Sequence, residues 1–273
     1  MTYDLIAIDM DGTLLNSDGR VSDRTRETVR LAIGSGAHVV LSTGRILRSA
    51  LNHSKDLNMN KAIIAANGAI VIDEKQDIIY EQKLSKEMVA HIIEIGEKNN
   101  MYYQFYGKDV FYSNAYLKEA TEFYKNRDPR NSTEIGFGLI KDKEEILEDN
   151  EIDIYKFLFL DKDIEKISDV RKQLSELKDI SISSSWSNNV EIMHKEVSKG
   201  NSLKHLCEKM DIPRERVIAI GDNENDLSML EYAGLSVAMG NGEEFVKSKA
   251  DIITDTNDED GVSKIIDKYI LYR

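Results

Sequence analysis

Asp9 and Asp11 are the residues in this sequence whose type and spacing most clearly suggest chemistry. They follow the apolar residues 5–8, which predict a strand buried on both faces of a parallel sheet. At the end of such a strand both carboxylates can point into one crevice, where they repel each other unless a cation lies between them. Gly12 permits a sharp turn, and the backbone N–H groups from Met10 to Gly12 can face an anion. The sequence therefore predicts a divalent metal and an anion here, although a polar turn would explain a lone Asp-X-Asp.

A second acidic cluster, Gly221-Asp222-Asn223-Glu224-Asn225-Asp226, follows the apolar residues 217–220. Its carboxylates and amides offer only oxygen ligands, which suit Mg2+. An EF-hand loop does not fit, because such a loop needs glycine at its sixth position, where Leu227 stands. Taken alone, the cluster could also be a turn that caps a helix.

Thr43, Gly44 and Lys199 could bind a phosphate. Thr43 and Gly44 follow the apolar residues 37–41 and begin a helical segment, so a hydroxyl and a backbone N–H become available for an anion. Lys199 could neutralise a phosphate or an attacking carboxylate, but a solvated lysine is the ordinary alternative. Arg45 either helps to hold the Thr43 loop or is a surface arginine. The five histidines show no metal-ligand or catalytic-triad spacing and are interpreted as structural residues.

The elements that must position these residues alternate as strands and helices in both outer parts of the chain. Apolar strands are expected near residues 5–8, 37–41, 62–66, 217–220 and 235–238, with helices between them. This pattern predicts an α/β fold with a doubly wound, Rossmann-like parallel sheet. Because ligands bind outside the carboxyl ends of parallel strands, the distant polar clusters should converge on one crevice.

The middle of the chain has a different character. Helices are expected at residues 86–99, 115–126 and 164–177, a loop at 126–132, and strands within 101–112, 155–160, 180–185 and 189–193. This set resembles an α+β unit whose sheet is covered by helices on one side. We therefore expect two domains, a discontinuous core formed by residues 1–84 and 190–273 and an inserted α+β domain at 85–189.

The composition limits the partners. The chain has 273 residues, 41% of them hydrophobic, and a formal net charge of -13. Such an acidic protein is a poor partner for nucleic acid or for an anionic membrane. Its one cysteine, Cys207, is expected to fill the core, and no apolar run has the length of a membrane span. These features favour a cytoplasmic protein whose partner is a small molecule.

Four motifs together resemble those of the haloacid dehalogenase superfamily. They are Asp9-Met10-Asp11-Gly12-Thr13, Thr43-Gly44-Arg45, Lys199-Gly200 and the cluster at 221–226. Their order and spacing, with Ala66-Asn67-Gly68-Ala69, are similar to the Cof-type (subclass IIB) sugar phosphatase branch, which carries an α/β cap between the second and third motifs. The resemblance extends over essentially the whole chain.

The resemblance implies a role for each matched residue. Asp9 would be the nucleophile that accepts the phosphoryl group, and Asp11 would protonate the leaving oxygen and then activate water. Thr43 and Lys199 would assist catalysis. Mg2+ would be held by Asp9, the main-chain carbonyl of Asp11 and Asp222. Phosphate would be bound by Met10, Thr43, Gly44, Lys199 and Asn225. Asn223 and Asp226 would orient these groups.

The resulting hypothesis is a Mg2+-dependent phosphatase that hydrolyses phosphomonoesters of small metabolites through an aspartyl-phosphate. Sugar phosphates are the first substrate class to consider, and phosphorylated cofactors the second. Two alternatives remain open at this point. One is a phosphomutase-type phosphotransferase, and the other is a protein that binds a phosphometabolite without turning it over.

Overall fold

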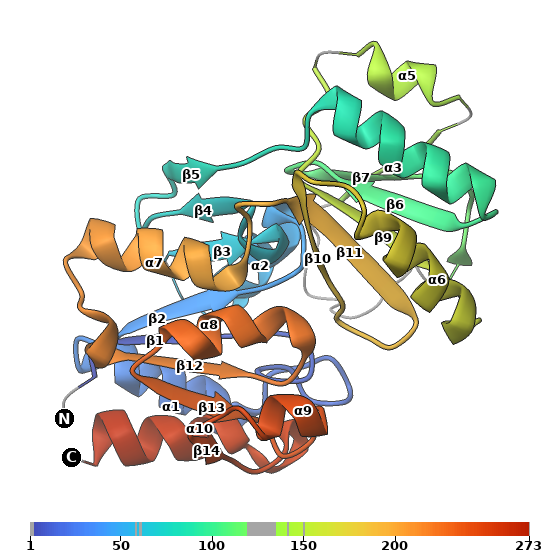
Figure 1. Ribbon diagram of the computed structural model, residues 1–273. Helices are drawn as coiled ribbons and strands as arrows, with labels where there is room; N and C mark the ends of the chain where they lie inside the picture. The colour runs from blue at the N-terminus through green and yellow to red at the C-terminus, as the bar shows by residue number, and fades with distance from the viewer. Residues whose placement is uncertain are drawn as a thin grey trace.

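The computed structural model describes residues 3–57, 59, 62–118, 135–140, 142–149 and 151–272. These residues form an eight-stranded sheet and a six-stranded sheet, which lie in two parts of the molecule (Figure 1). Both ends of the chain contribute to the eight-stranded sheet, and the middle forms the six-stranded one. No helix among the described residues combines the length and apolar character needed to cross a membrane.

The eight-stranded sheet has the order β14-β13-β12-β1-β2-β3-β4-β5. The neighbours from β14 to β3 are parallel, whereas β3, β4 and β5 pair antiparallel. Its strands are β1 (Leu5–Ile8), β2 (His38–Ser42), β3 (Ile63–Ala65), β4 (Ile70–Ile72), β5 (Ile78–Glu81), β12 (Val217–Gly221), β13 (Leu235–Ala238) and β14 (Ile252–Ile253).

Helices cover both faces of this sheet. Residues Leu5 and Ala7 of β1 pack in the cluster formed with α7 (Lys199–Met210) and α8 (Leu227–Tyr232). Ile6 and Ile8 point to the opposite face, where α1 (Asp23–Gly34) and α10 (Gly261–Ile266) lie. The predicted doubly wound α/β core, with strands buried on both faces, is thus confirmed. The remaining elements of this part are α2 (Leu47–Asp56), α9 (Glu244–Lys247) and the 3-10 or π segments η1 (Ala66–Gly68), η2 (Arg214–Arg216), η3 (Glu224–Asp226), η4 (Asn257–Glu259) and η5 (Asp267–Leu271).

The six-stranded sheet has the order β10-β11-β9-β6-β7-β8, and only its last pair is parallel. Helices α3 (Lys86–Lys98) and α6 (Ile164–Leu174) pack on one face against Phe105, Phe157 and Phe159. The other elements are β6 (Tyr102–Tyr106), β7 (Val110–Ser113), β8 (Gly136–Leu139), α5 (Glu144–Leu147), β9 (Lys156–Leu160), β10 (Ile180–Ser183) and β11 (Asn189–His194).

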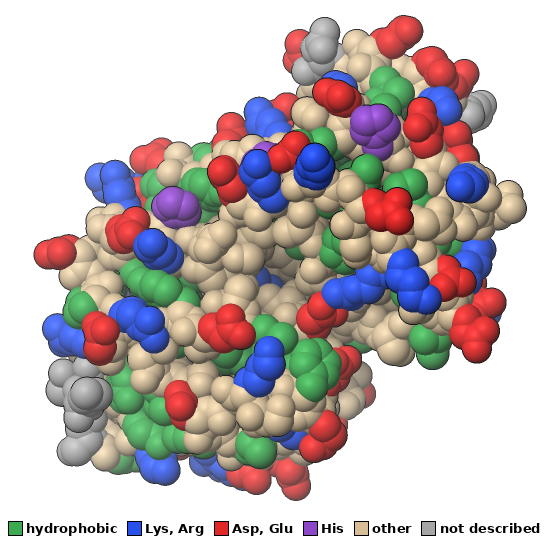
Figure 2. Space-filling model, viewed as in Figure 1, with side chains coloured by type: hydrophobic (Ala, Val, Ile, Leu, Met, Phe, Trp, Pro, Cys, Tyr) green, Lys and Arg blue, Asp and Glu red, His purple; other side chains and the backbone are tan. Residues whose placement is uncertain are grey.

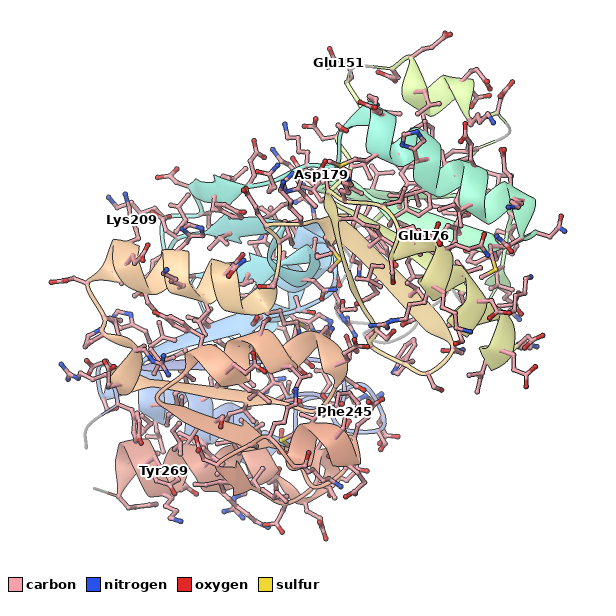
Figure 3. All side chains as sticks on the ribbon, in the orientation of Figure 1. Glu151, Glu176, Asp179, Lys209, Phe245 and Tyr269 are labelled. Carbon is pink, nitrogen blue, oxygen red and sulfur yellow. The ribbon has the colours of Figure 1, made fainter. Side chains whose placement is uncertain are left out.

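Figure 3 labels side chains in both parts of the molecule. Lys209, Phe245 and Tyr269 belong to the part that contains the eight-stranded sheet, and Glu151, Glu176 and Asp179 to the other part (Figure 3). Helices of the first part enclose the sheet from two sides, whereas α3 and α6 leave the second face of the six-stranded sheet to other contacts. That second face becomes important below.

Some elements differ from the sequence-based expectation. The strand expected over 101–112 is a hairpin of β6 and β7, and β8 and α5 had no counterpart in the prediction. Helix α7 begins at Lys199, because the Ser198 hydroxyl accepts the Asn201 N–H at 3.1 Å and caps the helix there. The expected helix 115–126 and loop 126–132 lie mostly outside the described residues.

The predicted domain boundary at residue 190 falls inside a strand. Strand β11 (Asn189–His194) pairs with β9 and β10 in the six-stranded sheet, so a boundary at residue 190 would cut through it. On strand pairing alone, the second core segment begins after His194. The assignment of the two segments to a core domain and a cap domain stays a prediction.

Candidate active site

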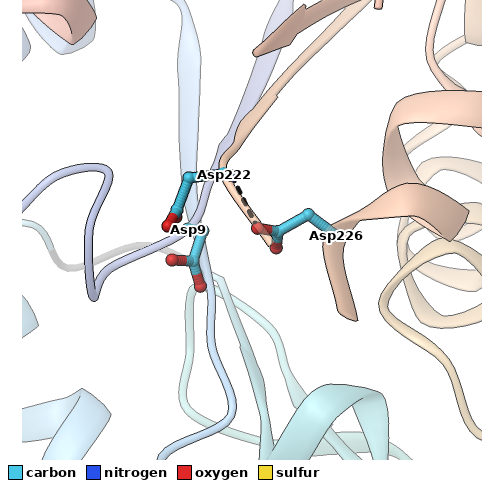
Figure 4. Close-up of side chains that lie close together, drawn as sticks. All are labelled: Asp9, Asp222 and Asp226. Atoms are coloured by element: carbon cyan, nitrogen blue, oxygen red, sulfur yellow. Dashed lines mark hydrogen bonds between the residues drawn. The ribbon is translucent and has the colours of Figure 1, made fainter. Parts of the chain in front are cut away.

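Three buried aspartates from two strand ends meet at one edge of the eight-stranded sheet (Figure 4). Asp9 follows β1, and Asp222 and Asp226 follow β12, which is the neighbour of β1 in the sheet. One carboxylate oxygen from each aspartate lies within 4.8 Å of the others. Strand pairing therefore brings together residues that are more than 200 positions apart in the sequence.

Lys199 is the positive charge in this cluster. Its ammonium group donates to Asp9 Oδ1 at 2.5 Å and to Asp226 Oδ1 at 2.6 Å, and the side chain is fully buried. It comes from the first turn of α7, which the Ser198 cap places beside the sheet edge. One ammonium thus faces two carboxylates, with the third nearby.

The charges in the cluster shift each other's ionisation. Burial raises the pKa of Asp9 well above its ordinary value, and Asp226 and Asp222 add to this effect while Lys199 opposes it. Burial and then Asp226 raise the pKa of Asp222 to about 7. Burial alone would lower the pKa of Lys199, but Asp226 and Asp9 raise it above its usual range. The cluster therefore holds three buried carboxyl groups against the single ammonium of Lys199. Such an excess of negative charge is expected of a site that takes a cation.

The remaining atoms of the acidic loops are held by local hydrogen bonds. Asp222 accepts the Thr13 hydroxyl at 2.7 Å and the Asn223 amide at 2.6 Å. Asp226 Oδ2 accepts the backbone N–H groups of Asp222 at 2.9 Å and Asn223 at 3.1 Å. Gly12 is required here, because its φ is +87° and a Cβ would lie 2.4 Å from Asp222 Oδ2.

The Thr43-Gly44-Arg45 loop, which follows β2, lies at the same edge of the sheet. Thr43 is buried, and its Oγ1 accepts the backbone N–H of Arg45 at 3.1 Å. The Thr43 carbonyl accepts the N–H of Asn67 at 2.9 Å, and the Arg45 carbonyl accepts that of Ala66 at 2.8 Å. The loop is thereby fixed to η1, the turn after β3.

Arg45 has a defined role that the sequence left open. Its guanidinium binds both carboxylate oxygens of Asp11, at 2.7 Å from Nε and 2.6 Å from Nη2, and the arginine is 4% exposed. Nη1 lies 2.7 Å from Nε2 of the buried His53 on α2. Because guanidinium only donates, Nε2 of His53 is the acceptor. Arg45 is therefore not a surface residue, and the hydrogen bond to His53 helps to hold its guanidinium in place.

One cavity connects these loops with the six-stranded sheet. It has a volume of about 250 Å³ and is lined on the core side by Asp9, Asp11, Gly44, Arg45, Asn223 and Asn225. The space-filling view shows a recess where the two parts meet, with acidic and basic side chains interspersed over the rest of this face (Figure 2).

The opposite wall of the cavity is the face of the six-stranded sheet that α3 and α6 do not cover. Side chains alternate along its strands, so β9 sends Phe157 and Phe159 to the helices and Lys156, Leu158 and Leu160 to the cavity. Strand register continues the same wall onto the neighbouring strands. The other lining residues of this wall are Gln104, Tyr106, Ser185, Trp186, Asn188, Asn189 and Glu191.

The residues proposed from the sequence thus occupy one region, but in different settings. Asp9, Asp11, Gly44, Asn223 and Asn225 line the cavity. Thr43, Lys199, Asp222 and Asp226 are buried beside them, and the Met10 side chain is buried in the hydrophobic core, so only its backbone could serve a ligand. Sequence reasoning missed the buried pair of Lys156 and Glu191 and the contacts of Asn67. Cys207 is buried, as predicted.

The sequence is similar to those of known hydrolases and phosphatases. Residues 6–266 match the family model of the haloacid dehalogenase-like hydrolases. The chain is 34% identical to phosphatase YwpJ of Bacillus subtilis strain 168, over 98% of this chain and 99% of that protein. It is 33% identical to the 5-amino-6-(5-phospho-D-ribitylamino)uracil phosphatase YcsE of that strain, over 98% and 96%.

Solved structures give the same result. A haloacid dehalogenase-like hydrolase from B. subtilis superposes with a TM-score of 0.88 at 33% identity, and covers 98% of this chain and all of its own (100%). One from Bacteroides thetaiotaomicron superposes with a TM-score of 0.82 at 32% identity, with 98% and 99% covered. With its four motifs gathered at one sheet edge, this chain belongs to the haloacid dehalogenase-like hydrolase family, in its Cof-type branch, and is a phosphatase.

Proposed function

We propose that the protein is a Mg2+-dependent phosphatase that hydrolyses phosphomonoesters of small metabolites through an aspartyl-phosphate on Asp9. One observation carries the proposal: Lys199 and Asp222 come from distant parts of the chain and gather around Asp9, and Asp9 lines the cavity. A merely structural polar cluster would have no reason to border a cavity that Asp11 and Gly44 also line.

The residues present fit a magnesium ion. The cluster offers carboxylate oxygens within 4.8 Å of one another, and Mg2+ prefers such hard ligands. We assign Asp9, the main-chain carbonyl of Asp11 and Asp222 as its ligands. Asp226 is a weaker candidate, because one of its oxygens accepts Lys199 and the other accepts two backbone N–H groups. When bound, Mg2+ supplies positive charge that stabilises the phosphoryl oxygens in the transition state.

The chain's own residues divide the reaction into two steps. In the first, a carboxylate oxygen of Asp9 forms a bond to phosphorus while the bond to the leaving oxygen breaks, and Asp11, in its protonated form with one oxygen released from Arg45, gives that oxygen a proton. In the second, Asp11 takes a proton from water, whose oxygen bonds to phosphorus as the bond to Asp9 breaks. Lys199 fixes the orientation of the Asp9 carboxylate, since it holds Oδ1 at 2.5 Å.

Phosphate recognition is assigned to groups of the same edge. The Thr43 hydroxyl, the ammonium of Lys199 and the amide of Asn225 would bind the phosphoryl oxygens, with backbone N–H groups near Met10 and Gly44. Asn223 and Asp226 orient this set, because Asn223 bonds to Asp222 and Asp226 bonds to Lys199. The role of Arg45 is to hold the carboxylate of Asp11.

Sugar phosphates and related polyhydroxylated phosphates are the proposed substrates. A cavity of about 250 Å³ suits a small molecule rather than a polymer. The relative YcsE is named for a substrate whose phosphate sits on a ribityl chain. Amide side chains of Gln104, Asn188 and Asn189 line the wall opposite Asp9 and can bind hydroxyl groups.

A phosphate-release screen tests this function. The wild-type protein and Asp9→Asn are incubated with a panel of phosphorylated metabolites and with p-nitrophenyl phosphate, each with and without Mg2+. We expect phosphate release only from the wild type and only with Mg2+. Turnover by Asp9→Asn would contradict the assignment of the nucleophile, and an isomerised product without free phosphate would indicate a phosphotransferase instead.

A further inference from the structure

Two buried charges on the cavity face of the six-stranded sheet have no part in the mechanism above. Lys156 on β9 and Glu191 on β11 are each 2% exposed, and Lys156 Nζ lies 2.7 Å from Glu191 Oε1. Burial would raise the pKa of Glu191, but the charge of Lys156 and the hydrogen bonds from Lys156 and Asn67 hold it below its ordinary value. A buried ion pair is rarely needed for stability, since apolar residues of similar volume serve as well.

Both members of this pair reach across to the part that contains Asp9. Lys156 Nζ donates to the carbonyl oxygen of Gly44 at 2.6 Å. The second carboxylate oxygen of Glu191, Oε2, accepts the side-chain amide of Asn67 at 2.7 Å. Asn67 Oδ1 in turn accepts the amide of Asn225 at 3.2 Å. The pair is therefore connected to two of the groups assigned to phosphate binding.

The contact with Gly44 fixes a specific peptide group. The carbonyl of the Gly44–Arg45 peptide is held by Lys156, and its N–H donates to Thr43 Oγ1 at 3.1 Å. This N–H occupies one acceptor site of the Thr43 oxygen and so fixes its position, and the hydroxyl proton is a separate donor that can bind a phosphate oxygen. Lys156 thus acts on the orientation of Thr43 through one rigid peptide plane.

Backbone conformation supports a positioning role for the surroundings. Ala66 and Asn67 have φ of 49° and 56°, in the left-handed region that residues with a side chain rarely adopt. Such conformations persist only when neighbouring contacts enforce them, and they concentrate at functional sites. The side chain of Asn67 is buried between Glu191 and Asn225, and a Cβ on Gly44 would lie 2.8 Å from Asn67 Oδ1.

We propose that Lys156, oriented by Glu191, is a positioning residue that sets the Thr43-Gly44 loop for phosphate binding. Phosphate affinity then depends on the six-stranded sheet lying against the loop, whatever leaving group the substrate carries. This inference rests on the proposed phosphatase function. It assigns to this face of the six-stranded sheet the positioning of the phosphate-binding loop, in addition to contact with the leaving group.

The test compares inorganic phosphate with two substrates. For Lys156→Met we measure the competitive inhibition constant of inorganic phosphate, together with KM and kcat for p-nitrophenyl phosphate and for one sugar phosphate found in the screen. We expect the inhibition constant and both KM values to rise by the same factor, about tenfold, as for the loss of one charge-assisted hydrogen bond. Lys156→Arg should recover part of the affinity.

Lys86→Met is the matched control. Its ammonium also donates to backbone carbonyls in the same part of the molecule, those of Ile146 at 2.6 Å, Asp149 at 2.7 Å and Ile152 at 3.0 Å, but not to the loop. We expect its phosphate inhibition constant to stay that of the wild type. If Lys156→Met does not fold, the double variant Lys156→Met/Glu191→Met removes the same ammonium without leaving an unpaired charge.

Two results would overturn the proposal. One is an unchanged phosphate inhibition constant in a folded variant that lacks Lys156. The other is a change confined to one of the two substrates, which would make Lys156 a leaving-group contact. Failure of the underlying phosphatase function is distinguishable, because the wild type itself would then release no phosphate from any ester.

Discussion

Among the described residues two lysines are buried, Lys199 beside the acidic cluster and Lys156 on the six-stranded sheet, and they differ in their charge balance. Lys199 contacts the carboxylates of Asp9 and Asp226, with Asp222 close by. Lys156 contacts a single carboxylate, Glu191, and a backbone carbonyl. The first setting has more negative than positive charge and leaves a place for a cation, whereas the second is balanced within the protein. We expect the setting with surplus negative charge to be the reaction centre and the balanced setting to be a positioning contact.

The two walls of the cavity also differ in the side chains that form them. The core wall consists of charged side chains, the amides of Asn223 and Asn225, and backbone from loops at strand ends. The wall from the six-stranded sheet combines amides of its own with Tyr106, Leu158, Leu160 and Trp186. Phosphoryl chemistry needs the first wall for any substrate, while the second wall, apart from Lys156 and Glu191, can contact only the leaving group. Substitutions at these other residues of the second wall should therefore change different kinetic constants from substitutions on the first wall.

Replacement of Lys199 should give the largest effect. Lys199→Met leaves buried carboxylates without their counter-charge, which lowers the free energy of unfolding by about 3–5 kcal/mol. Turnover should fall by about 10³-fold or more, because the phosphate and Asp9 both lose their positive partner. Urea unfolding and phosphate release measure the two effects.

The effect of Mg2+ on stability should differ between the variants of the two lysines. Mg2+ should restore part of the stability of Lys199→Met, because the ion neutralises the same carboxylates, and it should restore none of that lost in Lys156→Met. Equal responses of the two variants to Mg2+ would show that charge surplus does not distinguish the two sites.

An intermediate effect is expected on the core wall at Arg45. Arg45→Met removes both hydrogen bonds to the Asp11 carboxylate, so kcat should fall by about 10- to 100-fold. The loss should be greater for a sugar phosphate than for p-nitrophenyl phosphate, whose leaving group needs little protonation. Stopped assays with both esters measure it.

Arg48→Met provides the control for Arg45. Arg48 lies on the same helix, α2, and forms an exposed ion pair with Asp109 at 2.9 Å. Such pairs contribute little, so its kcat should stay close to the wild-type value. A comparable loss in both variants would indicate a general disturbance of α2 rather than a role at Asp11.

The smallest effect should come from the leaving-group wall. Trp186→Ala removes a ring that is 44% exposed at the cavity, and KM values should change by about fivefold. The change should differ among metabolites and alter their order of preference, while inhibition by inorganic phosphate stays constant. A uniform loss across all substrates would place Trp186 with the catalytic wall instead.

Much of the fold and of the acidic cluster could be predicted from the sequence, because the signals are local. The apolar runs before Asp9 and Asp222 predict two buried strands of one parallel sheet, and β1 and β12 are in fact neighbours that pair from Leu5 with Val217. Carboxylates at the ends of such strands must then meet. The family resemblance and the doubly wound sheet are confirmed by the comparisons and by the strand order.

The contacts between the two walls could not be predicted in this way. Glu191 alternates with apolar residues along β11, which is also the pattern of an ordinary sheet with one solvated face, and Lys156 is the first residue of the otherwise apolar β9, where a lysine is usually solvated. Only the packing of that face against the Gly44 loop buries them. The pairing of Arg45 with Asp11 and the membership of β11 in the six-stranded sheet depend on the same long-range packing.

The central claim is that Asp9 carries the phosphoryl group and Asp11 completes its release. We would mix Asp11→Asn with p-nitrophenyl phosphate and Mg2+, follow nitrophenol on the millisecond to second scale, and digest the quenched protein for mass spectrometry. The account predicts a burst of nitrophenol equal to the enzyme concentration, followed by slow turnover, and a phosphoryl group on Asp9. A phosphoryl group on any other residue, or a burst without covalent protein modification, would contradict it.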